Sequence, residues 1–325
     1  MLTAFGYALS GGVLVVLATG RPEQIAWRFL RLVGLLALAP ACLVTVAIWR
    51  APASTGPPAA AATAVLGLLL ATGAAAVVMA APLAHRWRAS FRGVCALAGL
   101  CGVAAAAMCM LPVLRDTPDD HRSTGVMIVI GAALGGLLLG SITVAWLLGH
   151  AYLTASNMTI APLRHFSRML SIAVGLRAAF LIISLTIAWA AADSDTPDHD
   201  AAVGAEPPAA LAAETATEIG TPAHTPTQAA AYPPAYRPAS DPASRAPTPH
   251  RPRTVLARLG GFWLVLTLRI GLGLLAVAVF AYMVSDCVRR RATQSATGIL
   301  YFGSVFAYIG ELAAGYLLVQ VAWPL

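Results

Sequence analysis

The sequence contains no lysine, and charged residues of every kind make up only 11% of its 325 positions. A soluble globular protein usually carries about 25% charged residues. Here 58% of the residues are hydrophobic, and the mean hydropathy is +0.75. This balance does not fit a water-soluble domain, and it indicates a protein that crosses a membrane several times.

Because lysine is absent, arginine supplies all the basic side chains other than histidine, and the formal net charge is +7. A positive charge can indicate a nucleic-acid partner, but membrane proteins keep basic residues in their cytoplasmic loops without one. We therefore expect the arginines to face a lipid bilayer and no nucleic acid. Missing lysine with abundant Ala, Arg, Gly and Pro is typical of a GC-rich bacterial genome, so the expected location is a bacterial cytoplasmic (inner) membrane.

Cysteine is also scarce, and none of the five cysteines belongs to a CxxC pair. Their spacing fits neither zinc nor iron–sulfur ligation, so we expect no metal site and no disulfide framework. The sequence has no GxSxG, P-loop, HExxH or GxGxxG motif in a credible context. Its clustered acidic residues fall in predicted outer loops. The sequence therefore does not favour an enzyme that acts on its own.

Long apolar stretches make up most of the sequence. A membrane-spanning helix needs about 20 apolar residues, because the hydrocarbon core is about 30 Å thick and each helical residue advances about 1.5 Å. The sequence thus predicts an all-α fold, a polytopic transmembrane helix bundle of about eight spanning helices. The apolar stretches are 3–19, 29–49, 59–81, 93–112, 125–149, 167–191, 260–285 and 295–322. The first has no basic residue before it, unlike a signal peptide, so we expect a spanning helix there.

The region 192–257 has a different composition, rich in Ala, Pro, Thr, Asp and Glu and almost without large aliphatic residues. It cannot bury enough apolar surface to offset the entropy of ordering, so we predict one long disordered external loop. It divides the chain into a six-helix region, 1–191, and a two-helix hairpin, 258–325. The loop is either a simple spacer or a flexible docking segment for an external partner.

The arginines outside the apolar stretches gather at one end of the predicted helices. Loops after the first, third, fifth and seventh helices are strongly basic, whereas the loop after the second has Arg50 alone and the loop after the fourth mixes arginines with aspartates. The arginines of the basic loops are Arg21, Arg28, Arg86, Arg88, Arg92, Arg164, Arg168, Arg289, Arg290 and Arg291. Since such residues accumulate on the cytoplasmic side, we predict that both termini and the 192–257 loop are extracytoplasmic.

A polar segment at 149–166, GHAYLTASNMTIAPLRHF, separates the fifth and sixth apolar stretches. Much of its polarity suits a cytoplasmic loop, and Tyr152 suits the aromatic belt at the membrane surface. His150, His165 and His85 are all expected near this face, where they form a predicted edge cluster with Tyr152. Such a cluster could bind haem or a metal ion, or could shuttle protons; we favour a proton or lipid-headgroup contact by His150.

Three ionisable residues lie deep inside apolar stretches: Arg177, Arg269 and Glu311. A charge at mid-bilayer costs about 2.5–3.5 kcal/mol even on lenient insertion scales, so each must face a partner in the bundle interior. Arg269 and Glu311 lie at similar depths in consecutive antiparallel helices, and we predict that they pair. Arg177 either joins them or finds another acceptor. With Tyr308 they form a predicted intramembrane polar site, which is either a structural ion pair or a site for a quinone, a proton path or an anion.

Three functional hypotheses follow from these features. The favoured one is a membrane subunit or accessory protein of a larger bacterial complex, either non-catalytic or quinone-linked. In helix count and intramembrane polarity the chain resembles the quinol-interacting membrane anchors of bacterial respiratory complexes, without a shared residue motif. A quinone is therefore the cofactor considered; haem is disfavoured, because haem ligands in membrane bundles usually project from within helices rather than from their edges.

The second hypothesis is a transporter of a small solute or ion that uses the intramembrane Arg/Glu cluster. No internal repeat and no helix broken by Gly or Pro is evident in the sequence, which speaks against it. The third hypothesis is a lipid-modifying enzyme that acts at the cytoplasmic face through His150 and His165.

The predicted orientation can be tested with reporter fusions. Alkaline phosphatase joined after Leu325 should be active, because that enzyme needs the oxidising extracytoplasmic space to form its disulfides. The same reporter joined after Arg290 should be inactive, whereas a green fluorescent protein at that point should fluoresce. The opposite pattern at the two sites would reverse the topology.

Overall fold

The computed structural model describes residues 1–50, 57–112, 121–154, 159–194, 259–321 and 323–325, and these residues form helices and no strand. Eight of the helical segments are long and apolar enough to cross a membrane, as the hydropathy predicts. Their bounds are α1 (Leu2–Thr19), α2 (Trp27–Arg50), α3 (Pro57–Ala80), α4 (Arg88–Met110), α5 (His121–Thr154), α6 (Ala161–Ser194), the continuous α9, η5 and α10 (Trp263–Ile270, Gly271–Ala276 and Val277–Arg289), and α11 (Thr293–Val321). The chain is therefore a multi-pass helical bundle.

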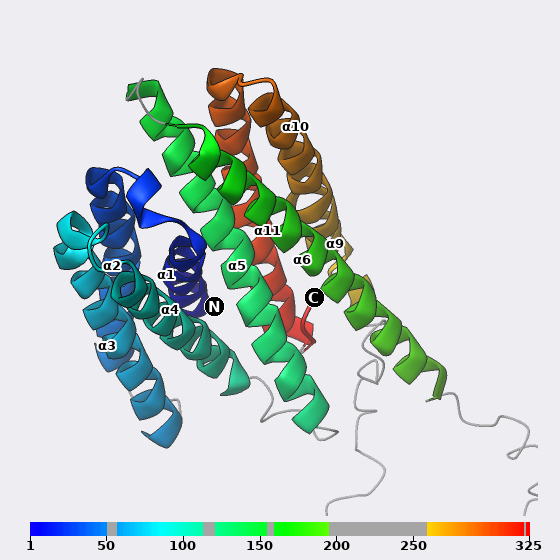
Figure 1. Ribbon diagram of the computed structural model, residues 1–325. Coiled ribbons are helices and arrows are strands. Elements are labelled where there is room, and N and C mark those ends of the chain that lie inside the picture. Colours follow the sequence, from blue (N-terminus) through cyan, green and yellow to red (C-terminus); the bar gives the residue numbers. More distant parts are fainter. Residues whose placement is uncertain (51–56, 113–120, 155–158, 195–258, 322) are drawn as a thin grey trace, which may run out of the picture.

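Helix α1 lies in the middle of the bundle and is the most buried of the eight candidate spans. Figure 1 shows α2, α3 and α4 on one side of it and α5, α6 and α9 to α11 on the other. The Tyr7 side chain is fully buried, and its hydroxyl lies 3.0 Å from Thr45 Oγ1 of α2. Helix α1 thus connects the two groups of helices.

Glycine allows α1 to approach its neighbours this closely. A Cβ at Gly11 would lie 2.7 Å from the Gly99 carbonyl oxygen of α4, and a Cβ at Gly12 would overlap the Gly136 carbonyl group of α5. Inside a membrane, helix association depends on such close packing, because lipid tails are as apolar as the side chains themselves. The two glycines therefore fix α1 against both groups of helices.

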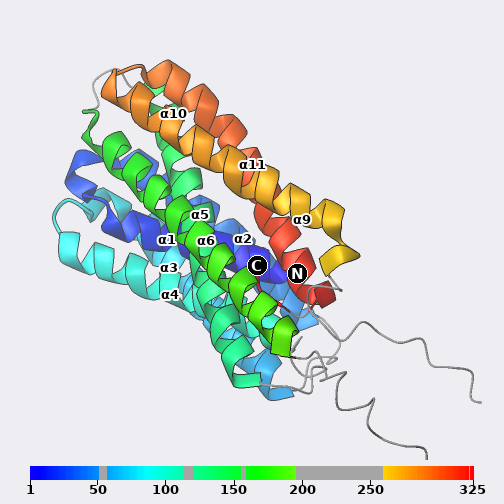
Figure 2. The same cartoon turned by 90° about the vertical axis from the view of Figure 1, so that its right-hand side faces the viewer.

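The last two spans pack against the fifth and sixth. Helix α11 lies along α5, and α10 contacts both α6 and α11, as Figure 2 shows. The stretch 195–258, which contains most of the predicted disordered loop, lies outside the described residues. The six-helix and two-helix regions, although separated by that stretch in the sequence, belong to one bundle.

The helix bounds differ from the hydropathy stretches in two informative ways. Helices α5 and α6 each continue over 34 residues, because their polar ends extend the helix beyond the apolar core. The seventh span is not a uniform α-helix, since Gly271–Ala276 forms a turn of π-helix within it. The span is continuous through this turn, which is an irregularity within a helix and not a break. Gly271 and Gly273 lack the side chains that would stiffen this turn.

The basic loops share one end of the bundle. Figure 1 shows that the connections after α1, α3, α5 and α10 lie toward its upper end, whereas both marked chain ends lie away from it. Met1 and Leu325 line one cavity, so the two ends are close in space. The predicted topology places both chain ends on the same side of the membrane, which requires an even number of crossings. The arrangement of the helices has this property.

The close helix crossing at Gly12 can be tested by adding a side chain. Gly12→Val should lower the free energy of unfolding by about 1–3 kcal/mol or more, because the added atoms meet backbone that cannot turn away. Thermal unfolding in mild detergent would measure this loss. Gly175→Val in α6 is the matched control, since a Cβ there meets nothing within 4 Å. Equal losses in the two variants would contradict the close crossing.

Candidate functional site: a buried Arg–Glu–Arg cluster

Three charged side chains from three helices meet inside the bundle: Arg177 of α6, Arg269 of α9 and Glu311 of α11. The predicted pair is present, with Arg269 Nη1 3.0 Å from Glu311 Oε1. Arg177 joins it, donating from Nε to Oε1 at 3.0 Å and from Nη2 to Oε2 at 2.9 Å. The side chains are 4%, 0% and 7% exposed, in the order Arg177, Arg269 and Glu311. We call this set the Arg–Glu–Arg cluster.

The two arginines are not equivalent. Arg177 holds the carboxylate through two parallel hydrogen bonds, the strong and directional arrangement that a guanidinium favours. Arg269 approaches the carboxylate through Nη1 alone, at ion-pair distance, and its Nε and Nη2 have no hydrogen-bond partner among the described residues. Arg177 Nη1 likewise has no hydrogen-bond partner there. The cluster therefore retains buried donors that can bind a further acceptor.

The cluster carries one negative and two positive groups, so its formal charge is +1 when all three are ionised. Burying charge away from water is costly unless it is paired and hydrogen-bonded, and one carboxylate cannot fully compensate two guanidinium groups. The Phe180 ring, 5.5 Å from Arg177 Cζ, adds a cation–π contact but no negative charge. An acceptor or anion bound beside the arginines would reduce this imbalance.

Glycines make the space that the cluster occupies. A Cβ at Gly135 of α5 would lie 2.7 Å from Glu311 Oε2, and a Cβ at Gly273 would lie 3.3 Å from Arg269 Nη1. Gly273 also packs directly on Gly310 of α11. The π-helical turn begins at Gly271, two residues after Arg269, and such turns are frequent at functional sites. The backbone is thus shaped locally around these side chains.

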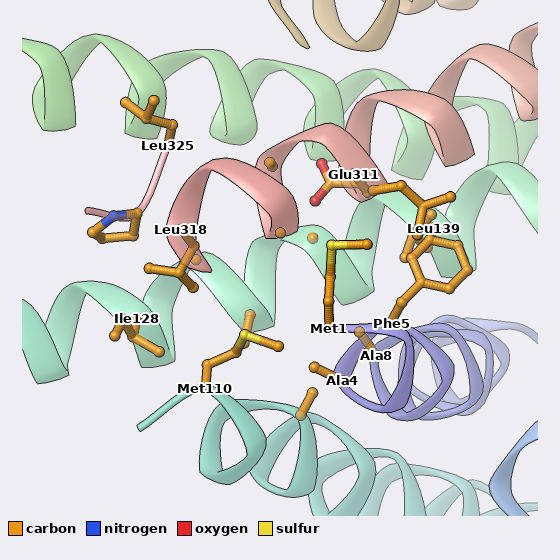
Figure 3. Close-up of a pocket in the computed structure, with 18 of the residues that line it drawn as sticks. Met1, Ala4, Phe5, Ala8, Met110, Ile128, Leu139, Glu311, Leu318 and Leu325 are labelled. Carbon is orange, nitrogen blue, oxygen red and sulfur yellow. The ribbon is translucent and has the colours of Figure 1, made fainter. Parts of the chain in front are cut away.

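An apolar cavity of about 90 Å³ ends at Arg177 and Glu311. Figure 3 shows its walls, built by Ala4, Phe5 and Ala8 of α1 together with Met110, Ile128, Leu139 and Leu318. Met1 and Leu325 also line this cavity. This volume is well above the roughly 10–15 Å³ that one water molecule needs. The cavity combines an apolar wall with charged hydrogen-bonding groups at one place.

Tyr308 does not contact the charged groups, although it was predicted to share their site. Its hydroxyl lies 2.8 Å from Thr143 Oγ1 of α5, and its ring packs edge-on against Phe5, a residue of the cavity wall. Tyr308 therefore supports the cavity wall rather than the ion pair. The sequence could not show this, because Tyr308 and Glu311 are only three residues apart on α11, which is less than one helical turn.

The predicted edge cluster of histidines is dispersed in the structure. His150 lines a shallow pocket between α5 and α11, whereas His165 contacts Thr19 at the end of α1, with Nε2 3.0 Å from Oγ1. His85 is exposed in the turn after α3, and Tyr152 donates a hydrogen bond to the Thr159 carbonyl oxygen. Among the described residues, no three His, Cys, Asp or Glu side chains are placed to bind a metal ion.

No family model, curated protein or solved structure matches this chain. The kind of ligand that the site could hold must therefore be inferred from the chemistry of its own residues. Guanidinium N–H groups donate to carbonyl, carboxylate or phenolate oxygens, and aliphatic walls hold an apolar ring or chain. The cavity with the Arg–Glu–Arg cluster provides both kinds of contact inside the membrane.

Removing the single carboxylate should destabilise the bundle strongly. Glu311→Gln leaves two buried arginines without a counter-ion, and breaking a buried pair in this way costs about 3–5 kcal/mol. Asp286→Asn is a matched control: Asp286 also contacts two arginines, Arg289 at 3.0 Å and Arg290 at 2.8 Å, but at the exposed end of α10. Its expected cost is about 0–1 kcal/mol. Thermal unfolding in detergent measures the loss of stability in both variants. A similar loss in Glu311→Gln and Asp286→Asn would contradict a buried, mutually dependent Arg–Glu–Arg cluster.

Proposed function

We propose that this protein is a membrane subunit or accessory protein of a larger bacterial complex, and that it binds a quinone-type ligand at the Arg–Glu–Arg cluster. The observation that carries the proposal is the apolar cavity that ends at Arg177 and Glu311. A quinone has a polar ring with carbonyl oxygens and an apolar tail, so it needs hydrogen-bond donors at one place and aliphatic walls around it. The cavity offers this combination within the membrane.

The charge of the cluster also supports an electron-rich ligand. Arg177 lines the cavity, and its Nη1 has no hydrogen-bond partner among the described residues. Buried donors without acceptors cost about 1–3 kcal/mol each, and more when charged, so a carbonyl oxygen placed there would be stabilising. A reduced or anionic form of the ring would be held more strongly than the neutral form, because the formal charge of the cluster is positive.

The subunit part of the proposal rests on composition and packing. Few side chains carry charge, and the helices meet through glycines whose role is close approach. The predicted external segment 192–257 adds a region suited to docking. Purification of the tagged protein from its own host in mild detergent, followed by mass spectrometry, tests this part. Stoichiometric membrane or redox subunits are expected, and recovery of the chain alone would contradict it.

A transporter is the second candidate, and the π-helical turn after Arg269 favours it. The turn at Gly271–Ala276 is a local irregularity in a continuous span beside a buried charge, and π-helical turns are frequent at functional sites. An anionic solute would be the substrate that suits a positive site. Uptake of labelled organic anions into proteoliposomes tests this candidate. The lipid-enzyme hypothesis gains no support, because His150 and His165 line different pockets.

Quinone binding can be tested by filling the cavity without touching the charges. Ala132→Leu adds aliphatic atoms to the α5 wall of the cavity and should weaken binding of a short-chain quinone at least tenfold. Ala133→Leu is the matched control, since Ala133 is the next residue, is similarly half-buried and does not line the cavity. Ligand-induced thermal stabilisation in detergent gives the two affinities.

Arg177→Lys completes this test. Lysine keeps the positive charge but lacks the planar fork that makes two parallel bonds, so quinone affinity should fall while the protein still folds. Binding that is indifferent to both Ala132→Leu and Arg177→Lys would overturn the proposed site.

A further inference from the structure

A second cavity lies at the opposite end of the bundle, among the basic loops. It has a volume of about 460 Å³ and is formed where the end of α1, the following loop, the start of α4 and the start of α6 meet. It is lined by Thr19, Gly20, Arg21, Gln24, Ile25, Arg92, Ala161, Pro162, His165 and Phe166. We call it the basic pocket. None of these lining residues is acidic, so the three basic side chains have no counter-charge in the pocket wall.

Arg92 is held in a fixed position at this pocket. Its Nε donates to the Ala18 carbonyl oxygen at 2.7 Å, which satisfies one of the acceptors left free at the C-terminal end of α1. The two Nη groups of Arg92 make no hydrogen bond among the described residues. A guanidinium anchored through Nε presents its remaining N–H groups as a fork, which suits the oxygens of a phosphate.

His165 is oriented in a comparable way. Thr19 Oγ1 lies 2.7 Å from the Val16 carbonyl oxygen, to which it donates, and 3.0 Å from His165 Nε2. With the hydroxyl proton directed to the Val16 carbonyl oxygen, Nε2 is the donor to Thr19. Arg21 and Arg92 lie in the same pocket wall as His165.

Two further features favour an anion in this pocket. Ala161 and Pro162 begin α6, so the positive end of its helix dipole lies at the pocket, although Pro162 itself has no N–H to donate. The nearest acidic residue of the loop, Glu23, is directed to Arg88, with Oε1 3.4 Å from Nη1. The carboxylate that could have neutralised the pocket is therefore engaged at another arginine.

We propose that the basic pocket binds a phosphate group through Arg21 and Arg92, beside the ring of His165. Basic pockets between spanning helices at the arginine-rich face of membrane proteins are suited to lipid head groups, and a free phosphate offers the same oxygens. This site is separate from the Arg–Glu–Arg cluster, which lies toward the other end of the bundle, so it stands independently of the proposed quinone site.

The test uses the full chain in a neutral detergent, with thermal stabilisation as the readout. Three probes are titrated: short-chain phosphatidylglycerol, short-chain phosphatidylcholine and inorganic phosphate. The double variant R21Q/R92Q should raise the apparent Kd of the effective probe at least tenfold. Arg86→Gln is the matched control, because Arg86 is an exposed arginine of the same basic face that does not line the pocket. If R21Q/R92Q does not fold, R21Q/R92K serves instead, with a smaller loss.

The outcomes separate the two sources of phosphate. Stabilisation by phosphatidylglycerol but not by inorganic phosphate identifies a lipid head group, and stabilisation by inorganic phosphate identifies a soluble ligand. Either result supports the site only if R21Q/R92Q weakens it and Arg86→Gln does not. No stabilisation by phosphatidylglycerol or phosphate, or equal binding by wild type and R21Q/R92Q, overturns the proposal. A purely structural role of Arg92 at the end of α1 would lower the melting temperature without changing the ligand-dependent shift.

Discussion

The interaction on which the rest of the structure depends is the contact of one carboxylate with two guanidinium groups inside the bundle. Glu311 receives two hydrogen bonds from Arg177 and an ion-pair contact from Arg269, and these residues come from α11, α6 and α9. In lipid, none of the three charges could remain unpaired at acceptable cost. The cluster therefore fixes the position of the last two spans against the sixth, although a long segment separates them in the sequence.

Close packing and charge depend on each other in this bundle. Gly135 and Gly273 leave the room that the charged side chains fill, and Gly273 meets Gly310 in direct backbone contact. The π-helical turn at 271–276 lies beside this crossing. A larger residue at Gly273 or Gly310 would meet the backbone of the facing helix and move it, and one at Gly135 would displace the Glu311 carboxylate. Either change would disturb the contacts between the charges. The same glycines that tighten the bundle thus define the shape of the site.

The two ends of the bundle offer different chemistry. One has an apolar cavity with a charged end, suited to a ring with a hydrophobic tail. The other has a cavity with Arg21, Arg92 and His165 in its wall, for which we propose a phosphate ligand. This division follows from the distribution of arginine: buried arginines need a carboxylate partner, whereas arginines in the loops can remain available for ligands. We therefore expect ligands to bind at the charged groups and not along the apolar helix faces that contact lipid.

The sequence by itself determined the number of spans, the all-helical class and the pairing of Arg269 with Glu311. Long apolar runs allow one backbone solution in a membrane, and equal depth in adjacent antiparallel helices brings two charges together. It did not determine whether Arg177 would join the pair, because that depends on how far α6 lies from α11. The dispersal of His150, His165 and His85, the π-helical turn and both cavities were also decided only by the tertiary structure. Each depends on how helices rotate and approach one another, which hydropathy does not encode. An amphipathic pattern could have fixed those rotations, but these spans are apolar on nearly all sides, so the contacts of individual glycines and arginines set them.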